Sequence, residues 1–161
     1  MNENDSRFKG RIDTEKIGVL GWSFGGASSG EACIKDKRIK AGINIDGSPH
    51  GSIVDENITQ PFLFLRNGER AVAKYFVNQV TNERYVVQIK GTSHFNFADM
   101  ALFNIPVVNK ILGTADGLEA INLTSRYVLE FFNKYLKGYE SKLFTKNSFN
   151  DELVELNFYD K

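Results

Sequence analysis

The 161-residue sequence is poor in several features, and each shortage excludes a class of protein. Its single cysteine, Cys33, excludes a disulfide within the chain, and we expect this thiol to be a small buried side chain rather than a nucleophile. The 20 basic residues match the 20 acidic ones, so no charge excess marks a nucleic-acid or anionic-membrane surface. No apolar run is long enough to span a bilayer, and residues 1–9 are polar, without the apolar core of a signal peptide.

The composition that remains is that of a globular domain, with 42% hydrophobic residues. There are no repeats or low-complexity segments. No cluster of histidine, cysteine and acidic residues has the spacing of metal ligands, so we expect no metal and no cofactor. We expect residues 1–161 to form a single domain, with its core in residues 12–138 and a mixed tail in residues 139–161.

Short apolar runs alternate with segments of helical spacing along the chain. The predicted strands cover residues 17–20, 41–45, 61–65 and 84–89, and the predicted helices cover residues 25–35, 69–80 and 117–137, with residues 95–111 partly helical. Strands that alternate with helices indicate parallel βαβ units. The sequence therefore predicts an α/β fold with about four parallel strands and helices on both faces of the sheet.

The motif G-W-S-F-G-G, at residues 21–26, lies between the first predicted strand and the first predicted helix. A G-x-S-x-G in this context is typical of a nucleophile elbow, because small residues two positions before and after the serine avoid collisions in the sharp turn. Ser23 is then the candidate nucleophile, and the backbone N–H of Phe24 is a candidate oxyanion donor at the helix N-terminus. Trp22 is either a rim residue of the substrate pocket or a packed aromatic, and the sequence leaves both open.

A serine nucleophile needs a base, and the chain has two histidines, His50 and His94. His94 follows the last predicted strand in a glycine-led loop, where hydrolases of the order Ser…Asp/Glu…His carry their base. We therefore assign the base to His94. His50 lies in a turn-rich segment in mid-chain, so we expect a turn or surface histidine there, or a residue at the pocket rim.

Two carboxylates compete to orient the histidine. Asp46 ends the second predicted strand, at the edge where open α/β sheets place their chemistry, although an aspartate before glycine also initiates turns. Glu69 lies just beyond the third predicted strand, although a carboxylate in the first turn of a helix has a structural reason of its own. The residues alone leave both open.

Residues 91–99, G-T-S-H-F-N-F-A-D, resemble the G-x-x-H-x-N-F-A-D histidine motif of the platelet-activating-factor acetylhydrolases of the serine-lipase type. The elbow is similar to their G-H-S-F-G-G, and I-D-G at residues 45–47 resembles their acid turn. The resemblance runs from about residue 17 to residue 138. It implies an α/β-hydrolase fold and a carboxylic-ester hydrolase of short-acyl lipid or small esters, with Ser23, His94 and Asp46 as the triad and Glu69 as the alternative acid.

Departures from that family modify the expectation. Trp22 stands where the family has histidine. With this tryptophan, residues 21–26 are similar to the G-W-S-M-G-G motif of cutinase-like polyester hydrolases. A dienelactone- or polyester-type hydrolase is therefore the first alternative. The second alternative is a catalytically silent fragment that acts only in assembly or binding.

The position of the elbow adds an expectation about the extent of the chain. In α/β-hydrolases the elbow follows the fifth strand of the sheet, so we expect this chain to be the C-terminal half of such a domain. It would then contain only one of the two backbone donors to the oxyanion, and we expect the isolated chain to have weak or no activity. The first predicted strand would then be an exposed apolar edge open to self-association. The sequence leaves the cellular compartment open.

Overall fold

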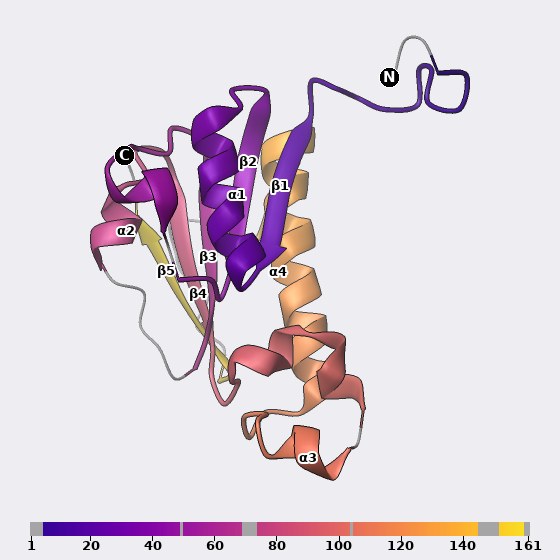
Figure 1. Ribbon diagram of the computed structural model, residues 1–161, viewed down its shortest axis with the longest axis vertical. Helices are drawn as coiled ribbons and strands as arrows, with labels where there is room; N and C mark the ends of the chain where they lie inside the picture. Colours follow the sequence, from indigo (N-terminus) through magenta and orange to yellow (C-terminus); the bar gives the residue numbers. More distant parts are fainter. Residues whose placement is uncertain (1–4, 49, 69–73, 104, 145–151, 160–161) are drawn as a thin grey trace.

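The computed structural model describes residues 5–48, 50–68, 74–103, 105–144 and 152–159 (Figure 1). They contain one five-stranded sheet in which the strands follow one another in chain order. The strands are β1 (Ile17–Trp22), β2 (Ile39–Ile45), β3 (Phe62–Asn67), β4 (Arg84–Ile89) and β5 (Val154–Tyr159). β1 to β4 are parallel, and β5 pairs with β4 in the antiparallel sense. The predicted parallel βαβ arrangement is confirmed.

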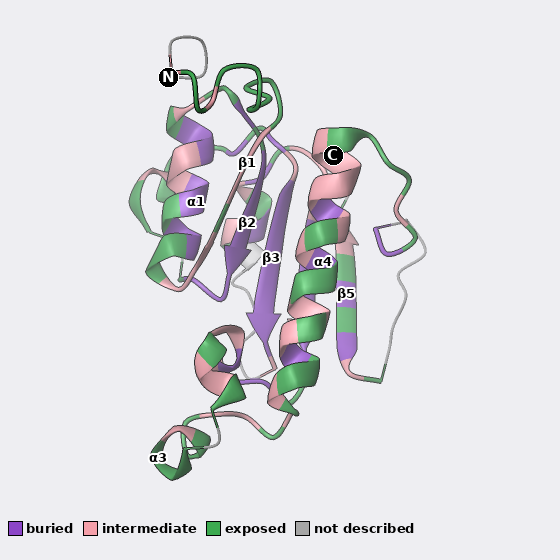
Figure 2. Cartoon of the chain, turned by 90° about the vertical axis from the view of Figure 1, so that its right-hand side faces the viewer, coloured by how far each residue is buried: buried purple, intermediate pink, exposed green. Residues whose placement is uncertain are grey.

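Helices cover both faces of this sheet, as predicted. Figure 2 shows α1 and α4 on opposite sides of the strands. The α-helices are α1 (Phe24–Lys35), α2 (Lys74–Asn78), α3 (Pro106–Asn109) and α4 (Gly117–Lys137), and the 3-10 helices are η1 (Gly51–Val54), η2 (His94–Phe97) and η3 (Asp99–Leu102). Within the described residues, no helix combines the length and the apolar character that a membrane span needs.

Each face of the sheet buries its own hydrophobic core. Alternate side chains of a strand point to opposite faces, so the continuous apolar run of β3 supplies both cores. On the α1 side, Phe62 and Phe64 pack with Cys33 of the helix. On the α4 side, Leu63 and Leu65 share a cluster with buried aromatic side chains of β4 and α4. All residues of β3 are buried, which places this strand in the middle of the domain.

The long helix α4 has the bounds that the sequence predicts. It begins after Asp116, whose side chain accepts a hydrogen bond from the N–H of Glu119, and it ends at Gly138, which has a φ of 71°. Its apolar stripe includes Phe132 and Leu136, which press against β1 so closely that Gly18 has no room for a side chain.

The largest difference from the prediction is β5, which lies in the segment described above as a tail. Its sequence V-E-L-N-F-Y buries Val154 and Leu156 and exposes the glutamate and asparagine between them, which is the alternation of an edge strand. Its partner β4 lies more than 60 residues earlier, so local pattern alone does not indicate the pairing. At the other end of the described strand order lies β1, where Leu20 is 49% exposed.

Candidate active site

Ser23 occupies the sharp turn between β1 and α1. Its backbone has φ 57° and ψ −124°, a region that residues with a side chain rarely adopt. The turn is held by a 2.9 Å hydrogen bond from the Ser23 N–H to the carbonyl oxygen of Ile45 on β2. The strained conformation predicted for the nucleophile elbow is therefore present.

The glycine requirement of this turn differs in part from the prediction. A Cβ on Gly21 would lie 2.2 Å from the backbone carbon and oxygen of Gly25, so this position admits only glycine. A Cβ on Gly25 would meet no atom within 4 Å. The prediction that a small residue two positions after the serine avoids a collision is therefore wrong for a side chain at Gly25. The crowded position in the helix is instead Gly26, where a Cβ would lie 2.4 Å from the amide oxygen of Asn44.

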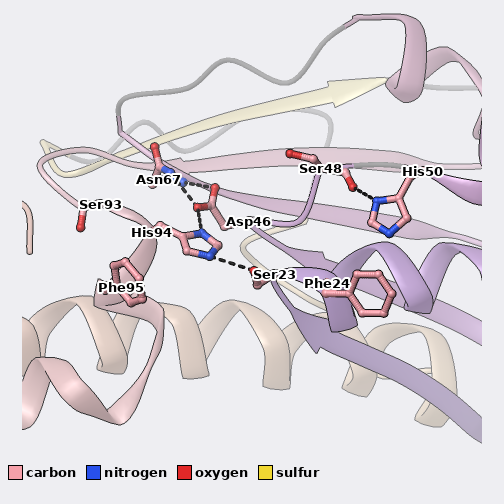
Figure 3. Close-up of a pocket in the computed structure, with 9 residues that line it drawn as sticks. All are labelled: Ser23, Phe24, Asp46, Ser48, His50, Asn67, Ser93, His94 and Phe95. Carbon is pink, nitrogen blue, oxygen red and sulfur yellow. Dashed lines mark hydrogen bonds and ion pairs between the residues drawn. The ribbon is translucent and has the colours of Figure 1, made fainter. Parts of the chain in front are cut away.

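His94 is the first residue of η2, in the loop after β4. Its Nε2 lies 2.9 Å from Ser23 Oγ, and its Nδ1 lies 2.7 Å from Asp46 Oδ2 (Figure 3). Both ring nitrogens are thus engaged, one by the candidate nucleophile and the other by a carboxylate. The chain brings Ser23, His94 and Asp46 together from the ends of three different strands.

Asp46 follows β2 and is buried, with 6% of its surface exposed. Its φ of 52° turns the carboxylate toward the histidine loop. The backbone N–H and the side-chain Nδ2 of Asn67 donate to its two oxygens at 3.2 and 2.7 Å, and the Arg66 guanidinium lies 3.5 Å away. A buried carboxylate with these partners is held in one orientation, which is what a group that orients a histidine needs.

The competing acid, Glu69, lies outside the described residues. Asn67 and Arg66, by contrast, are site residues that the sequence analysis missed. Both end β3, beside the carboxyl end of β2, and this position was the signal available in the sequence. Arg66 also donates to the carbonyl oxygen of Gly47, at 3.0 Å.

The loop that carries His94 is fixed by its own hydrogen bonds. The amide oxygen of Asn96 accepts from the N–H groups of Ser93 and Gly113, both at 2.8 Å, and Ser93 Oγ donates to the carbonyl oxygen of Ile111 at 2.6 Å. Asn96 is fully buried. The asparagine of the H-x-N motif therefore shapes the loop rather than facing the pocket.

Trp22 lies against the same loop, which answers the question that the sequence left open. Its Nε1–H donates to the backbone oxygen of His94 at 3.1 Å, and its ring stacks on the imidazole with centroids 4.9 Å apart. Trp22 is therefore a packed aromatic next to the candidate base.

A pocket of about 550 Å³ opens beside Ser23. Its walls are Ser23, Phe24, Asp46, Ser48, His50, Asn67, Ser93, His94 and Phe95. Phe24 is the first residue of α1, so its N–H is among the helix amides that lack an intrahelical partner and is available to an oxyanion. His50 lies at the rim, with Nδ1 2.8 Å from the Ser48 carbonyl oxygen and its ring 5.0 Å from that of Phe24 (Figure 3).

Two other groups bear on the chemistry. Cys33 is buried in the α1-side core, and this burial raises the pKa of its thiol to about 12, as expected for a packed side chain rather than a nucleophile. Among the described residues, no group of three or more histidine, cysteine, aspartate and glutamate side chains is arranged to hold a metal ion.

Comparisons with known proteins bear on the family of the chain. The model of the family "Platelet-activating factor acetylhydrolase, isoform II" matches residues 2–153. The chain is similar to the platelet-activating factor acetylhydrolases of Cavia porcellus (30% identical over 148 residues, 84% of this chain and 34% of the relative) and Canis lupus familiaris (33% over 141 residues, 81% and 32%). It thus spans about a third of the length of these curated relatives.

A solved structure gives the same result for the fold. A ferulic acid esterase from Streptomyces cinnamoneus superposes with a TM-score of 0.81 and 27% sequence identity, covering 95% of this chain and 50% of that one. The predicted α/β-hydrolase fold is confirmed.

Proposed function

Because this chain belongs to the platelet-activating factor acetylhydrolase, isoform II, family, we propose that it hydrolyses carboxylic esters with a Ser23–His94–Asp46 triad. The proposed substrates are short-acyl lipid esters or small carboxylic esters.

The observation that carries this proposal is the unbroken series of contacts from Ser23 to His94 to Asp46, at 2.9 and 2.7 Å. A neutral serine hydroxyl is a poor nucleophile near pH 7 and needs an adjacent base. The carboxylate holds the imidazole in the tautomer with hydrogen on Nδ1, so that Nε2 can accept the serine proton. The distance between Ser23 Oγ and His94 Nε2 lies within the reach of proton transfer, and the distance between His94 Nδ1 and Asp46 Oδ2 is that of the hydrogen bond that orients the ring.

The proposed reaction has two halves. His94 Nε2 takes the Ser23 proton as Oγ attacks the ester carbonyl, and the resulting oxyanion accepts a hydrogen bond from the Phe24 N–H. The tetrahedral intermediate collapses, the C–O bond to the alcohol breaks, and His94 returns its proton to the leaving alkoxide. A water molecule then attacks the acyl-serine with His94 again as base, which releases the carboxylic acid and restores Ser23.

The pocket leaves room for an acyl group beside Ser23. Its volume is about 550 Å³, and the aromatic rings of Phe24, Phe95 and His50 are among its walls. The relatives are named for an acetyl ester: besides the acetylhydrolases, a probable 1-alkyl-2-acetylglycerophosphocholine esterase of Arthroderma benhamiae is 43% identical over 53 residues. An acetyl ester of a glycerophospholipid is therefore the first substrate to test.

A second candidate is hydrolysis of a small aromatic ester, as the name of the structural neighbour suggests. The aromatic rim formed by Phe24 and His50 favours it, because these rings can stack on a planar substrate. A dienelactone or polyester substrate belongs to the same test, since the same serine would attack it.

The deciding experiment combines a serine-directed fluorophosphonate probe with turnover of acetyl phospholipid, feruloyl ester, aryl acetate and lactone. We expect labelling of the wild-type chain and hydrolysis of at least the acetyl esters. Ser23→Ala should abolish both. Ser28→Ala, which removes an exposed hydroxyl of the same helix outside the pocket, should leave both unchanged.

Labelling that persists in Ser23→Ala would refute the assignment of the nucleophile. A folded chain with neither labelling nor turnover would instead support the silent fragment that acts only in assembly or binding.

A further inference from the structure

Trp22 connects the candidate nucleophile to the candidate base through two separate contacts. It is the last residue of β1 and directly precedes Ser23 in the chain. Its indole N–H donates to the backbone oxygen of His94, at 3.1 Å. Its ring face lies on the imidazole, with centroids 4.9 Å apart and planes inclined by 29°. One side chain thus contacts both the backbone and the ring of His94.

The polar bonds of the imidazole place nothing against its faces. The bonds at Nδ1 and Nε2 lie at the edge of the ring and, with the covalent link to Cβ, leave small tilts of the ring to be limited by packing on its faces. The side chain of His94 is 34% exposed, so packing surrounds the ring only in part. The indole supplies a third constraint, on the ring face, and Phe95 meets the imidazole edge-on with centroids 5.4 Å apart.

The backbone contact has a similar consequence. His94 begins a short 3-10 helix, and the hydrogen bonds of Asn96 and Ser93 hold the loop to itself and to Ile111. The indole N–H of Trp22, at the end of β1, donates a hydrogen bond to the His94 carbonyl oxygen and so ties the loop to the strand that precedes Ser23. A displacement of about 1 Å between reacting groups can cost about 100-fold in rate, so this link bears directly on the Ser23–His94 distance.

We propose that Trp22 is a positioning residue that sets the plane of the His94 imidazole and its distance from Ser23, an inference that rests on the triad proposed above. When the imidazole accepts the serine proton, the indole face beneath it also attracts the new positive charge. Trp22 is not among the residues that line the pocket, and its contacts are with the backbone and the ring of His94, so it acts through His94.

The stack can be tested without any catalysis, because Trp22 is the single tryptophan of the sequence. An imidazole stacked on an indole changes the surroundings of the indole and therefore its fluorescence. We expect His94→Gln, which removes the stacked ring, to change the intrinsic fluorescence of the folded chain. His50→Gln and Ser23→Ala leave the stack in place and should not change it.

The kinetic consequence is tested with two variants and a control. Trp22→Leu removes both the stack and the N–H donor and should lower kcat, and the rate of fluorophosphonate labelling at Ser23, about 100-fold with KM unchanged. Trp22→Phe keeps a ring on the imidazole and loses only the hydrogen bond, so we expect about a fivefold loss. Tyr139→Leu truncates an exposed aromatic far from the pocket lining and should change neither value.

The outcomes separate this inference from the proposed function. A fluorescence that His94→Gln leaves unchanged, or a Trp22→Leu variant that raises KM at constant kcat, would overturn the positioning role. A chain that shows the His94-dependent fluorescence change but no turnover and no labelling would overturn the ester-hydrolase proposal, while the contact between Trp22 and His94 would stand.

Discussion

Replacement of Gly21 by alanine tests the turn on which the candidate nucleophile depends. The added Cβ would lie 2.2 Å from the backbone carbon and oxygen of Gly25, whereas an ordinary contact begins near 3.4 Å. Both partners are backbone, so the strand end and the helix start must separate by about 1 Å. We expect overpacking to lower the free energy of unfolding by about 1–3 kcal/mol. The same displacement should slow Ser23 labelling and turnover by about 100-fold.

Gly25→Ala is the matched control, because it adds the same methyl group to the residue that faces Gly21. Its Cβ would meet no atom within 4 Å. Alanine in a helix is more favourable than glycine by about 0.5–1 kcal/mol, so the free energy of unfolding should stay the same or rise. The labelling rate of Ser23 should not change.

Urea denaturation followed by circular dichroism gives the free energy of unfolding of each variant. The rate of fluorophosphonate labelling, measured without urea, gives the reactivity of Ser23 in the folded variant. The reasoning is refuted if Gly21→Ala matches the wild type in both measurements, or if Gly25→Ala proves as damaging as Gly21→Ala.

Two further predictions concern buried groups. Asn67→Ala removes the 2.7 Å amide hydrogen bond to the Asp46 carboxylate, and urea denaturation should show a loss of about 1.5–3 kcal/mol together with a lower kcat. Burial raises the pKa of the Cys33 thiol from 9.0 to about 12, so this thiol should resist iodoacetamide at pH 8 until the chain is unfolded. Since the unfolded thiol ionises first, this group should also make unfolding easier as the pH rises from about 9 toward 12.

Each of these has its own counter-result. Asn67→Asp keeps the size but places a second carboxylate beside Asp46, so a loss no larger than that of Asn67→Ala would contradict the assigned contact. Fast alkylation of the native protein at Cys33 would show that the thiol is accessible and not packed against β2 and β3.

The sequence predicts β1 to β4 because each contains a short apolar run. β3 and β4 are short apolar runs bounded by polar residues, and their bounds differ from the prediction by no more than two residues. β5 was missed because it is an edge strand with alternating polar residues, and because its partner is distant in the chain. The pattern V-E-L-N-F-Y becomes informative only once β4 is seen to have a free side.

The candidate site divides in the same way. The motif around Ser23 and the loop of His94 are local signals, since a strained turn and a glycine-led loop depend on neighbouring residues. The choice between Asp46 and Glu69 needed a family resemblance. Asn67 and Trp22 carry no motif of their own as partners of Asp46 and His94, and each contact joins elements that are distant in the chain.

By itself the sequence determined the elements and the residue types that can do chemistry, because periodicity, turn-forming glycines and apolar runs act over a few neighbouring residues. Only the tertiary structure decided which side chains meet. The parallel register of β1 to β4 brings their carboxyl ends to one edge, where the residues that follow β1, β2 and β4 place Ser23, Asp46 and His94 within hydrogen-bond distance. Distances of this kind arise from packing between segments far apart in the chain, which no local pattern encodes.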